Sequence, residues 1–224
     1  MPTGRYTVMD GKGNPMGTEE FRCAPGPAGW RYFSTIETKV PQPHRETVDL
    51  VVDGEWRFVR VRVDTGDHDL VLGAGAQRWI GTRDGEPLEL DPADDVDYLS
   101  PAFNAATANR LGESGGFGGV ARPDQSGADI TRRADPLRNW EIEVLYVEPF
   151  TLEPVRMGQR YELEGLEEVE TPVGRFSAVR WTYTALPSGW SRPLWVAGDV
   201  VVAYEDVFEL VAYDPGPRGP FPAG

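Results

Sequence analysis

Four aspartates fall within seven positions near the middle of the chain, a density that raises the question of cation binding or proton transfer. The cluster comprises Asp91, Asp94, Asp95 and Asp97. A calcium loop of the EF-hand type needs a glycine at its sixth position and a glutamate at its twelfth, and this cluster has neither. Carboxylates also lie favourably just before a helix, against the positive end of its dipole. Two other interpretations are a solvated helix start and a structural network in which Asp95 or Asp97 turns inward.

The remaining residues with catalytic or metal-binding chemistry are few and poorly spaced. Ser114 lies in a Gly-Glu-Ser-Gly-Gly sequence, but a nucleophile elbow needs a strand before the serine and a helix after it. Both histidines, His44 and His68, precede that serine, and the single cysteine, Cys23, has no neighbouring histidine. This spacing fits no zinc site. We therefore predict no metal, no cofactor and no serine-hydrolase centre.

The charge of the chain limits its partners. The formal net charge is −14, from 36 acidic and 22 basic residues, and such a field repels nucleic acid and anionic membranes. No run approaches the 18 apolar residues of a membrane-spanning helix, and the first residues lack the apolar core of a signal peptide. With one cysteine in 224 residues, no internal disulfide forms. We expect a cytoplasmic protein without nucleic-acid partners, and its oligomeric state stays open.

Most of the chain that must position these residues has sequence patterns typical of β-strands. Asp-Gly pairs at positions 10–11, 53–54 and 84–85 are strong hairpin signals. Between such turns lie short segments rich in valine, threonine and aromatic residues. The predicted strands cover residues 30–38, 46–53, 55–64, 67–73, 76–82, 86–90 and 139–148, a meander over 158–185, and further strands over 190–197, 199–206 and 207–214.

One short helix interrupts this pattern. Ser100 suits a helix cap, Pro101 suits the first helical position, an alanine-rich run follows, and Gly112 suits the position after the end. These signals predict a helix over residues 100–111 that covers the sheet. The glycine-rich segment 112–127 around Phe117 is either a mobile lid or a flexible linker.

Together these elements predict a mainly β protein. A large curved antiparallel sheet forms a half-barrel or a closed barrel, with the one short helix as its cover. We expect residues 1–212 to form a single β-barrel-like domain and residues 213–224 to form a Pro/Gly-rich tail.

The aromatic residues point to a cavity in such a barrel. Seven tryptophans, eight tyrosines and nine phenylalanines make up 11% of the chain. Most belong in a packed core, but a barrel of many strands also has room for an apolar ligand. The predicted ligand-binding residues are Trp79, Phe103, Asn104, Arg110, Phe117, Trp140, Ile142, Val144, Trp181, Trp190 and Trp195.

Residues 95–111, Asp-Val-Asp-Tyr-Leu-Ser-Pro through Arg-Leu, resemble a motif of the bacterial glycolipid-binding family, also described as a domain of unknown function. Gln159 and Tyr161 resemble its Gln-x-Tyr pair, and the likeness extends in order over most of residues 45–212. The resemblance implies a LolA/LppX-like half-barrel with helical cover and an apolar cavity. Phe103 stands where the family has threonine, and one of its two arginines is missing, so recognition here is expected to differ.

The motif also has a structural explanation that needs no ligand. An ion pair between Asp95 or Asp97 and Arg110 would hold the helix against the preceding strand. Breaking a buried pair of this kind from one side costs about 3–5 kcal/mol. We further expect Asn104 to satisfy backbone amides at a strand end.

Three functions follow from these expectations. The first is binding of a hydrophobic small molecule or lipid-like ligand in the lumen. The alternative is a cofactor-independent cyclase or isomerase acting on a hydrophobic, polyketide-like substrate, through its shape and acid–base help. Its candidate catalytic residues are Asp97, Tyr98, Tyr146 and Tyr183. A third possibility is an interaction protein that uses the acidic outer face. A polar group isolated in the apolar lumen would favour catalysis over carriage.

Overall fold

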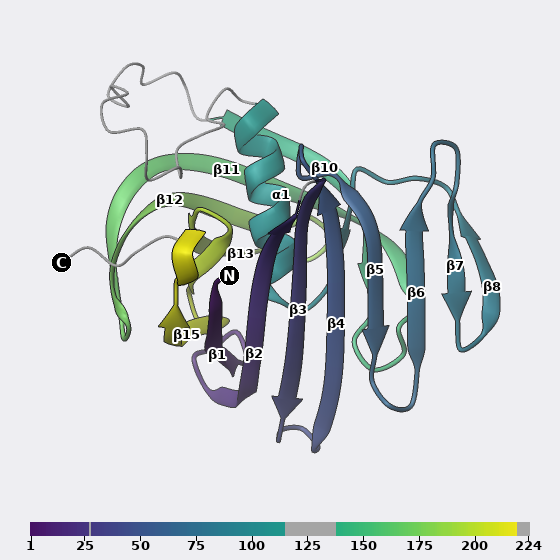
Figure 1. Cartoon of the computed structure of the whole chain (residues 1–224), viewed down its shortest axis with the longest axis horizontal. Helices are drawn as coiled ribbons and strands as arrows, with labels where there is room; N and C mark the ends of the chain where they lie inside the picture. The colour runs from purple at the N-terminus through teal and green to yellow at the C-terminus, as the bar shows by residue number, and fades with distance from the viewer. Residues whose placement is uncertain (27, 115–137, 219–224) are drawn as a thin grey trace.

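The computed structural model describes residues 1–26, 28–114 and 138–218 (Figure 1). Within them one sheet of fifteen strands accompanies one α-helix, α1 (Pro101–Ser114), and a short 3-10 turn, Gly216–Arg218. The strands are β1 (Thr3–Met9), β2 (Pro15–Gly26), β3 (Gly29–Thr38), β4 (His44–Asp53), β5 (Phe58–Asp64), β6 (Asp69–Ala74), β7 (Trp79–Arg83), β8 (Glu86–Leu90), β9 (Asp95–Asp97), β10 (Arg138–Val147), β11 (Pro154–Thr171), β12 (Gly174–Ala185), β13 (Trp190–Ala197), β14 (Val200–Tyr204) and β15 (Phe208–Asp214).

The order of strands shows that the sheet is curved but open. It runs from β8 down to β1, continues with β15, and then descends from β14 to β9. Every neighbouring pair is antiparallel except β9 and β10, which run parallel. The prediction of a mainly β half-barrel is therefore confirmed. A closed barrel is not formed, because β8 and β9 are two separate edges that do not pair.

The predicted turns and strands agree with the structure over most of the chain. Asp84 and Gly85 both have positive φ, 54° and 80°, between β7 and β8, as a two-residue hairpin turn requires. Strands β1 and β2 are not among the predicted segments. Their alternation is obscured because Glu19, a charged residue, is fully buried in β2.

Helix α1 forms where the sequence predicts it, but it lies deeper than a cover. The Ser100 hydroxyl accepts a hydrogen bond from the backbone N–H of Ala102 at 3.4 Å and caps the helix. All residues from Pro101 to Ala108 are buried, and the helix contacts β4, β9 and β14. Figure 1 shows it in the hollow between the wing around β2–β4 and the wing around β11–β13. The helix therefore fills much of the space that the sequence leads us to expect as lumen.

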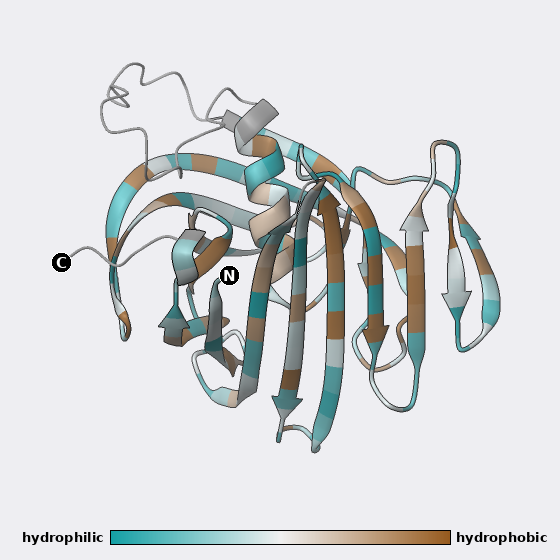
Figure 2. Ribbon diagram, in the orientation of Figure 1, coloured by the Kyte–Doolittle hydropathy of each residue, from teal (hydrophilic) through white to brown (hydrophobic). Residues whose placement is uncertain are grey.

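The core lies on the inner face of the sheet. Along β4, buried Val48, Leu50 and Val52 alternate with more exposed residues, and this alternation is visible as bands of hydropathy in Figure 2. A strand with one buried face gives this period of two. The helix of the described residues lacks the length and apolar character needed to cross a membrane.

A close backbone contact between β2 and β3 allows the register of these paired strands to be tested. A Cβ atom added at Gly17 would lie 2.1 Å from the carbonyl oxygen of Glu37 on β3. The Gly17→Ala variant should lower the free energy of unfolding by about 1–3 kcal/mol, because two paired strands must move apart. At Gly54 an added Cβ meets no atom within 4 Å, so Gly54→Ala should change stability by less than about 0.5 kcal/mol. Urea denaturation measures both, and equal effects would contradict the register.

Candidate functional site

The inner face of strands β9 to β14 brings the candidate site together. Trp140 on β10 pairs with Tyr161 on β11, and Tyr161 pairs with Tyr183 on β12. Residues paired across a sheet share a face. This face is the one turned to α1, because Asn104 of the helix donates a hydrogen bond to the Tyr161 hydroxyl at 2.9 Å. The expected role of Asn104 at a strand end is therefore wrong.

A continuous row of aromatic rings crosses this face from β10 to β2. Each ring contacts the next with centroids between 4.8 and 6.4 Å apart, as favourable aromatic pairs require. The row consists of Trp140, Trp181, Tyr161, Tyr183, Tyr204, Phe208, Tyr6 and Phe21. Trp190 joins it from β13, 5.9 Å from Tyr183. Most of these rings are buried, but Trp140 and Trp190 are only partly so.

Asp97 is a carboxyl group on this aromatic face. It lies on β9 opposite Tyr146 of β10, and its Oδ2 atom accepts a hydrogen bond from Gln159 Nε2 at 2.5 Å. The residue is 8% exposed, and burial raises the pKa of Asp97 to about 7, although the bonds from Gln159 and the Tyr98 backbone oppose this. A group that exchanges its proton near neutrality is suited to acid–base chemistry.

Tyrosines surround Asp97. Burial raises the pKa of Tyr146, Tyr161, Tyr183 and Tyr204, and the negative charge of Asp97 adds to the shift in each case. Their hydroxyls are therefore neutral throughout the ordinary pH range. Two of the predicted catalytic residues, Tyr146 and Tyr183, thus lie in the electrostatic reach of a third, Asp97.

Tyr98, the fourth predicted catalytic residue, belongs to a different network. Its hydroxyl donates to Glu46 Oε2 at 2.6 Å, and the same oxygen lies 3.0 Å from His44 Nε2. Burial is the largest cause that raises the pKa of Tyr98, followed by the charge of Glu46. Tyr98 follows the end of β9 and bonds to Glu46, but it still lies within electrostatic reach of Tyr146, the residue opposite Asp97.

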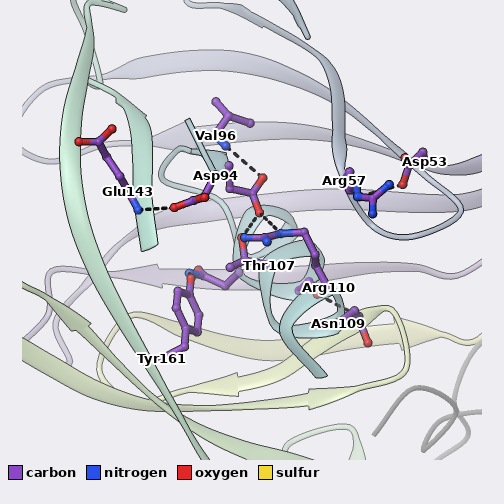
Figure 3. A network of polar contacts seen from close by, with 12 residues as sticks. Asp53, Arg57, Asp94, Val96, Thr107, Asn109, Arg110, Glu143 and Tyr161 are labelled. Carbon is purple, nitrogen blue, oxygen red and sulfur yellow. Dashed lines mark hydrogen bonds and ion pairs between the residues drawn. The ribbon is translucent and has the colours of Figure 1, made fainter. Parts of the chain in front are cut away.

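Asp95 holds the far half of α1 against strand β9 through Thr107 and Arg110, two residues of the helix that Figure 3 labels. Its Oδ2 atom accepts hydrogen bonds from Thr107 Oγ1 at 2.9 Å and Arg110 Nε at 3.1 Å. The backbone N–H of Val96 donates to Oδ1 at 3.0 Å. The expected ion pair between a motif aspartate and Arg110 is confirmed. Burial still raises the pKa of Asp95, and the nearby Arg110 charge opposes that shift.

The other two aspartates of the cluster lie outside this network. Asp91 and Asp94 are exposed, and Asp94 accepts a hydrogen bond from the Glu143 backbone N–H at 2.9 Å, as Figure 3 shows. Among the described residues, no group of three or more His, Cys, Asp or Glu side chains could hold a metal ion. The inward-turned network is thus the arrangement that the structure shows.

A second buried carboxylate, Glu19, contacts the start of α1. The Ser100 hydroxyl donates to Glu19 Oε1 at 2.6 Å, and burial raises the pKa of Glu19 to about 7. Within the described part of the chain its Oε2 atom has no hydrogen-bond partner. A hollow beside it, bordered by Tyr6 and Ala102, has space for about one water molecule. Sequence reasoning misses Glu19, although its place in the alternation Glu19, Phe21, Cys23 indicates an inward side chain.

The remaining predicted ligand residues divide into three groups. Phe103, Ile142, Val144 and Trp181 are packed core residues, each at most 8% exposed. Trp79 packs against Phe58 with ring centroids 4.5 Å apart, away from the aromatic row. Phe117, with the predicted lid beyond residue 114, lies outside the described residues.

Trp195 lies on the other side of β13 from the aromatic row. Leu194 pairs with Trp181 on the inner face, so its neighbour Trp195 points the opposite way. There its Nε1 atom donates to Glu167, and the Arg180 guanidinium lies 5.5 Å from its ring centroid. The predicted tryptophan set is therefore separated, and Trp140 and Trp190 remain as partly exposed members on the inner face.

Comparisons with known proteins support the fold. No protein-family profile and no curated protein matches the chain. A DUF1089 family protein from Pseudomonas aeruginosa is 21% identical with a TM-score of 0.54, over 85% of this chain and 91% of that one. A β-barrel-like protein of domain of unknown function DUF1849 from Brucella abortus is 9% identical with a TM-score of 0.51, over 95% and 96%. These likenesses show a β-barrel-like fold, and the LolA/LppX-like family is not confirmed.

The raised pKa of Glu19 predicts how stability depends on pH. A carboxyl group whose pKa rises on folding stabilises the protein at low pH and loses that contribution as pH rises through the folded pKa. Glu19→Gln removes this dependence, so the variant should gain on the order of 3 kcal/mol relative to wild type between pH 4.5 and pH 8. Urea denaturation across this pH range measures the difference.

The matched control is Glu20→Gln, a change at an exposed neighbour on the same strand. Its stability relative to wild type should stay constant across the same pH range. A parallel response of Glu19→Gln and Glu20→Gln would refute a buried, proton-binding Glu19.

Proposed function

We propose that the protein binds a hydrophobic small molecule or lipid-like ligand on the inner face of the half-barrel, beside α1. The main observation is that partly exposed apolar side chains accompany the buried aromatic row on that face. These are Trp140, Tyr146, Met157 and Trp190. Ligand pockets are lined mainly by apolar and aromatic groups with a few placed polar groups, and Asp97 and Gln159 are such groups here.

The position of α1 constrains what the ligand can be. The helix occupies the middle of the concavity, so a guest contacts the wing of β10–β13 rather than a wide lumen. Core residues such as Trp181 and Phe103 then support the contact surface from behind. This geometry favours a flat or slender apolar molecule over a bulky one.

The two solved structures with this fold are compatible with a ligand-binding barrel. The resemblance of residues 95–111 to the glycolipid-binding family supports a lipid-like guest, and we keep that family and its LolA/LppX-like grouping as part of the proposal. A cytoplasmic location, which fits the absence of disulfides, is also part of it.

A second candidate function is cofactor-independent isomerisation or cyclisation of a hydrophobic, polyketide-like substrate in the same place. Asp97 favours it, because a carboxyl group with a pKa of about 7 on an aromatic surface can exchange a proton with a bound substrate. Tyr146 and Tyr183 lie beside it, whereas Tyr98 is bonded to Glu46.

Native mass spectrometry of freshly purified protein should reveal a retained molecule. Incubating that molecule with wild type and with Asp97→Asn separates turnover from carriage.

Binding on the inner face predicts a contrast between two tryptophans. Trp140→Ala should weaken the binding of Nile red, an uncharged apolar dye, about tenfold, because roughly 1–3 kcal/mol of apolar contact is lost. Trp195→Ala removes an indole of the same size from the opposite face and should leave dye affinity unchanged. Fluorescence titration gives both dissociation constants.

Thermal unfolding of both variants provides the folding control, since a folded Trp140→Ala protein is needed for the comparison. Equal dye affinities of the two folded variants, or no saturable dye binding by wild type, would speak against a ligand site on this face.

A further inference from the structure

Three tyrosine hydroxyls on the inner face have no hydrogen-bond partner among the described residues. They belong to Tyr146, Tyr183 and Tyr204, whereas the hydroxyl of the fourth tyrosine around Asp97, Tyr161, accepts a hydrogen bond from Asn104. None of the three oxygens belongs to the fully buried atoms without a partner, so each is open to a molecule from outside. Polar groups at such a surface pair with water or with a ligand, and these three O–H groups on an aromatic face are free to donate to either.

These hydroxyls converge on Asp97. Tyr146 is its direct neighbour across β9 and β10. The Tyr183 ring lies 5.4 Å from Tyr161 and 6.4 Å from Tyr204, centroid to centroid. The charge of Asp97 acts on each of these tyrosines. Gln159 orients the carboxyl group through Oδ2, so one fixed carboxyl group lies within electrostatic reach of all three tyrosines.

We propose that Asp97 and the hydroxyls of Tyr146, Tyr183 and Tyr204 bind the carbonyl oxygen of an otherwise apolar, uncharged ligand. This inference rests on the proposed ligand binding and specifies the chemical class of the guest. The tyrosines and the protonated form of Asp97 offer O–H donors, and a carbonyl oxygen has two lone pairs to accept from them.

The charges around the subsite explain why the ligand is uncharged. An anion would be repelled by Asp97 whenever that group is ionised. A cation would lie close to the guanidinium of Arg192, which pairs across the sheet with Tyr183 and whose charge Asp206 compensates in part, with Oδ2 3.6 Å from Arg192 Nε. A neutral oxygen acceptor avoids both costs and satisfies the unpaired hydroxyls.

Protonation of Asp97 makes this preference depend on pH. Below its pKa of about 7 the carboxylic acid donates a hydrogen bond, and above it the carboxylate repels the carbonyl oxygen. The tyrosines around it stay neutral between pH 6 and pH 8, because the pKa of each is raised. They are Tyr146 on β10, Tyr161 on β11, Tyr183 on β12 and Tyr204 on β14. Other charged groups of this region are Asp95 on the same strand, which bonds to Arg110 of α1, and Arg192 on β13, opposite Tyr183.

A matched pair of probes tests the inference with the whole chain. 2-Acetylnaphthalene carries a ketone, and 2-ethylnaphthalene has nearly the same shape without an oxygen acceptor. Wild type should bind the ketone about tenfold more tightly at pH 6, as expected from one or two net hydrogen bonds. This ratio should fall at pH 8. In Asp97→Asn, whose amide donates at both pH values, the ratio should not change with pH.

Two phenylalanine variants locate the effect. Tyr183→Phe should lower the ketone-to-hydrocarbon ratio several-fold, whereas Tyr213→Phe, which also removes an unpaired hydroxyl but lies elsewhere, should leave it unchanged. Equal binding of the two probes by wild type, or equal effects of the two variants, would overturn the carbonyl subsite while leaving apolar ligand binding intact. Failure of both probes to bind would instead remove the proposed function and this inference together. The ketone-to-hydrocarbon affinity ratio of wild type and its change between pH 6 and pH 8 test the carbonyl subsite even if a variant does not fold.

Discussion

The attachment of helix α1 inside the curved sheet is the constraint on which the rest of the structure depends. Carboxylates anchor both halves of the helix, Glu19 at Ser100 and Asp95 at Thr107 and Arg110. Removing one partner of a buried ion pair leaves a charge without compensation, which is strongly destabilising. These bonds hold the helix in place inside the concavity, where it contacts β4, β9 and β14.

The same interior keeps several acids in an unfavourable environment. Burial raises the pKa of Glu19, Asp95, Asp97 and Asp199, so each costs stability whenever it is ionised. Glu19 and Asp95 offset part of this free-energy cost, because their hydrogen bonds hold the helix in place. Asp97 has no such role, because its partner Gln159 is an uncharged strand residue. A buried acid that does not serve the fold is a reasonable place to look for function.

Local signals made the helix and most strands predictable from sequence. Ser100 and Pro101 mark the helix start, and Asp84-Gly85 marks a hairpin. The pairing of Asp97 with Gln159 was not predictable, because it depends on the parallel register of β9 with β10, formed across a long gap in the chain. Nor did residue type separate Trp190 from Trp195. Counting parity along β13 would have done so, since residues five apart in a regular strand face opposite sides.

The meeting of β1 with β15 in the middle of the sheet has a consequence for how the molecule assembles. Thr3 pairs with Asp214, so β1 is synthesised more than 200 residues before β15, the strand that covers its second edge. Until then β1 presents open amide and carbonyl groups, which invite pairing with other chains. Contacts between such distant segments also slow folding. The arrival of β15, rather than formation of the individual hairpins, thus sets the moment at which the two wings become one continuous sheet.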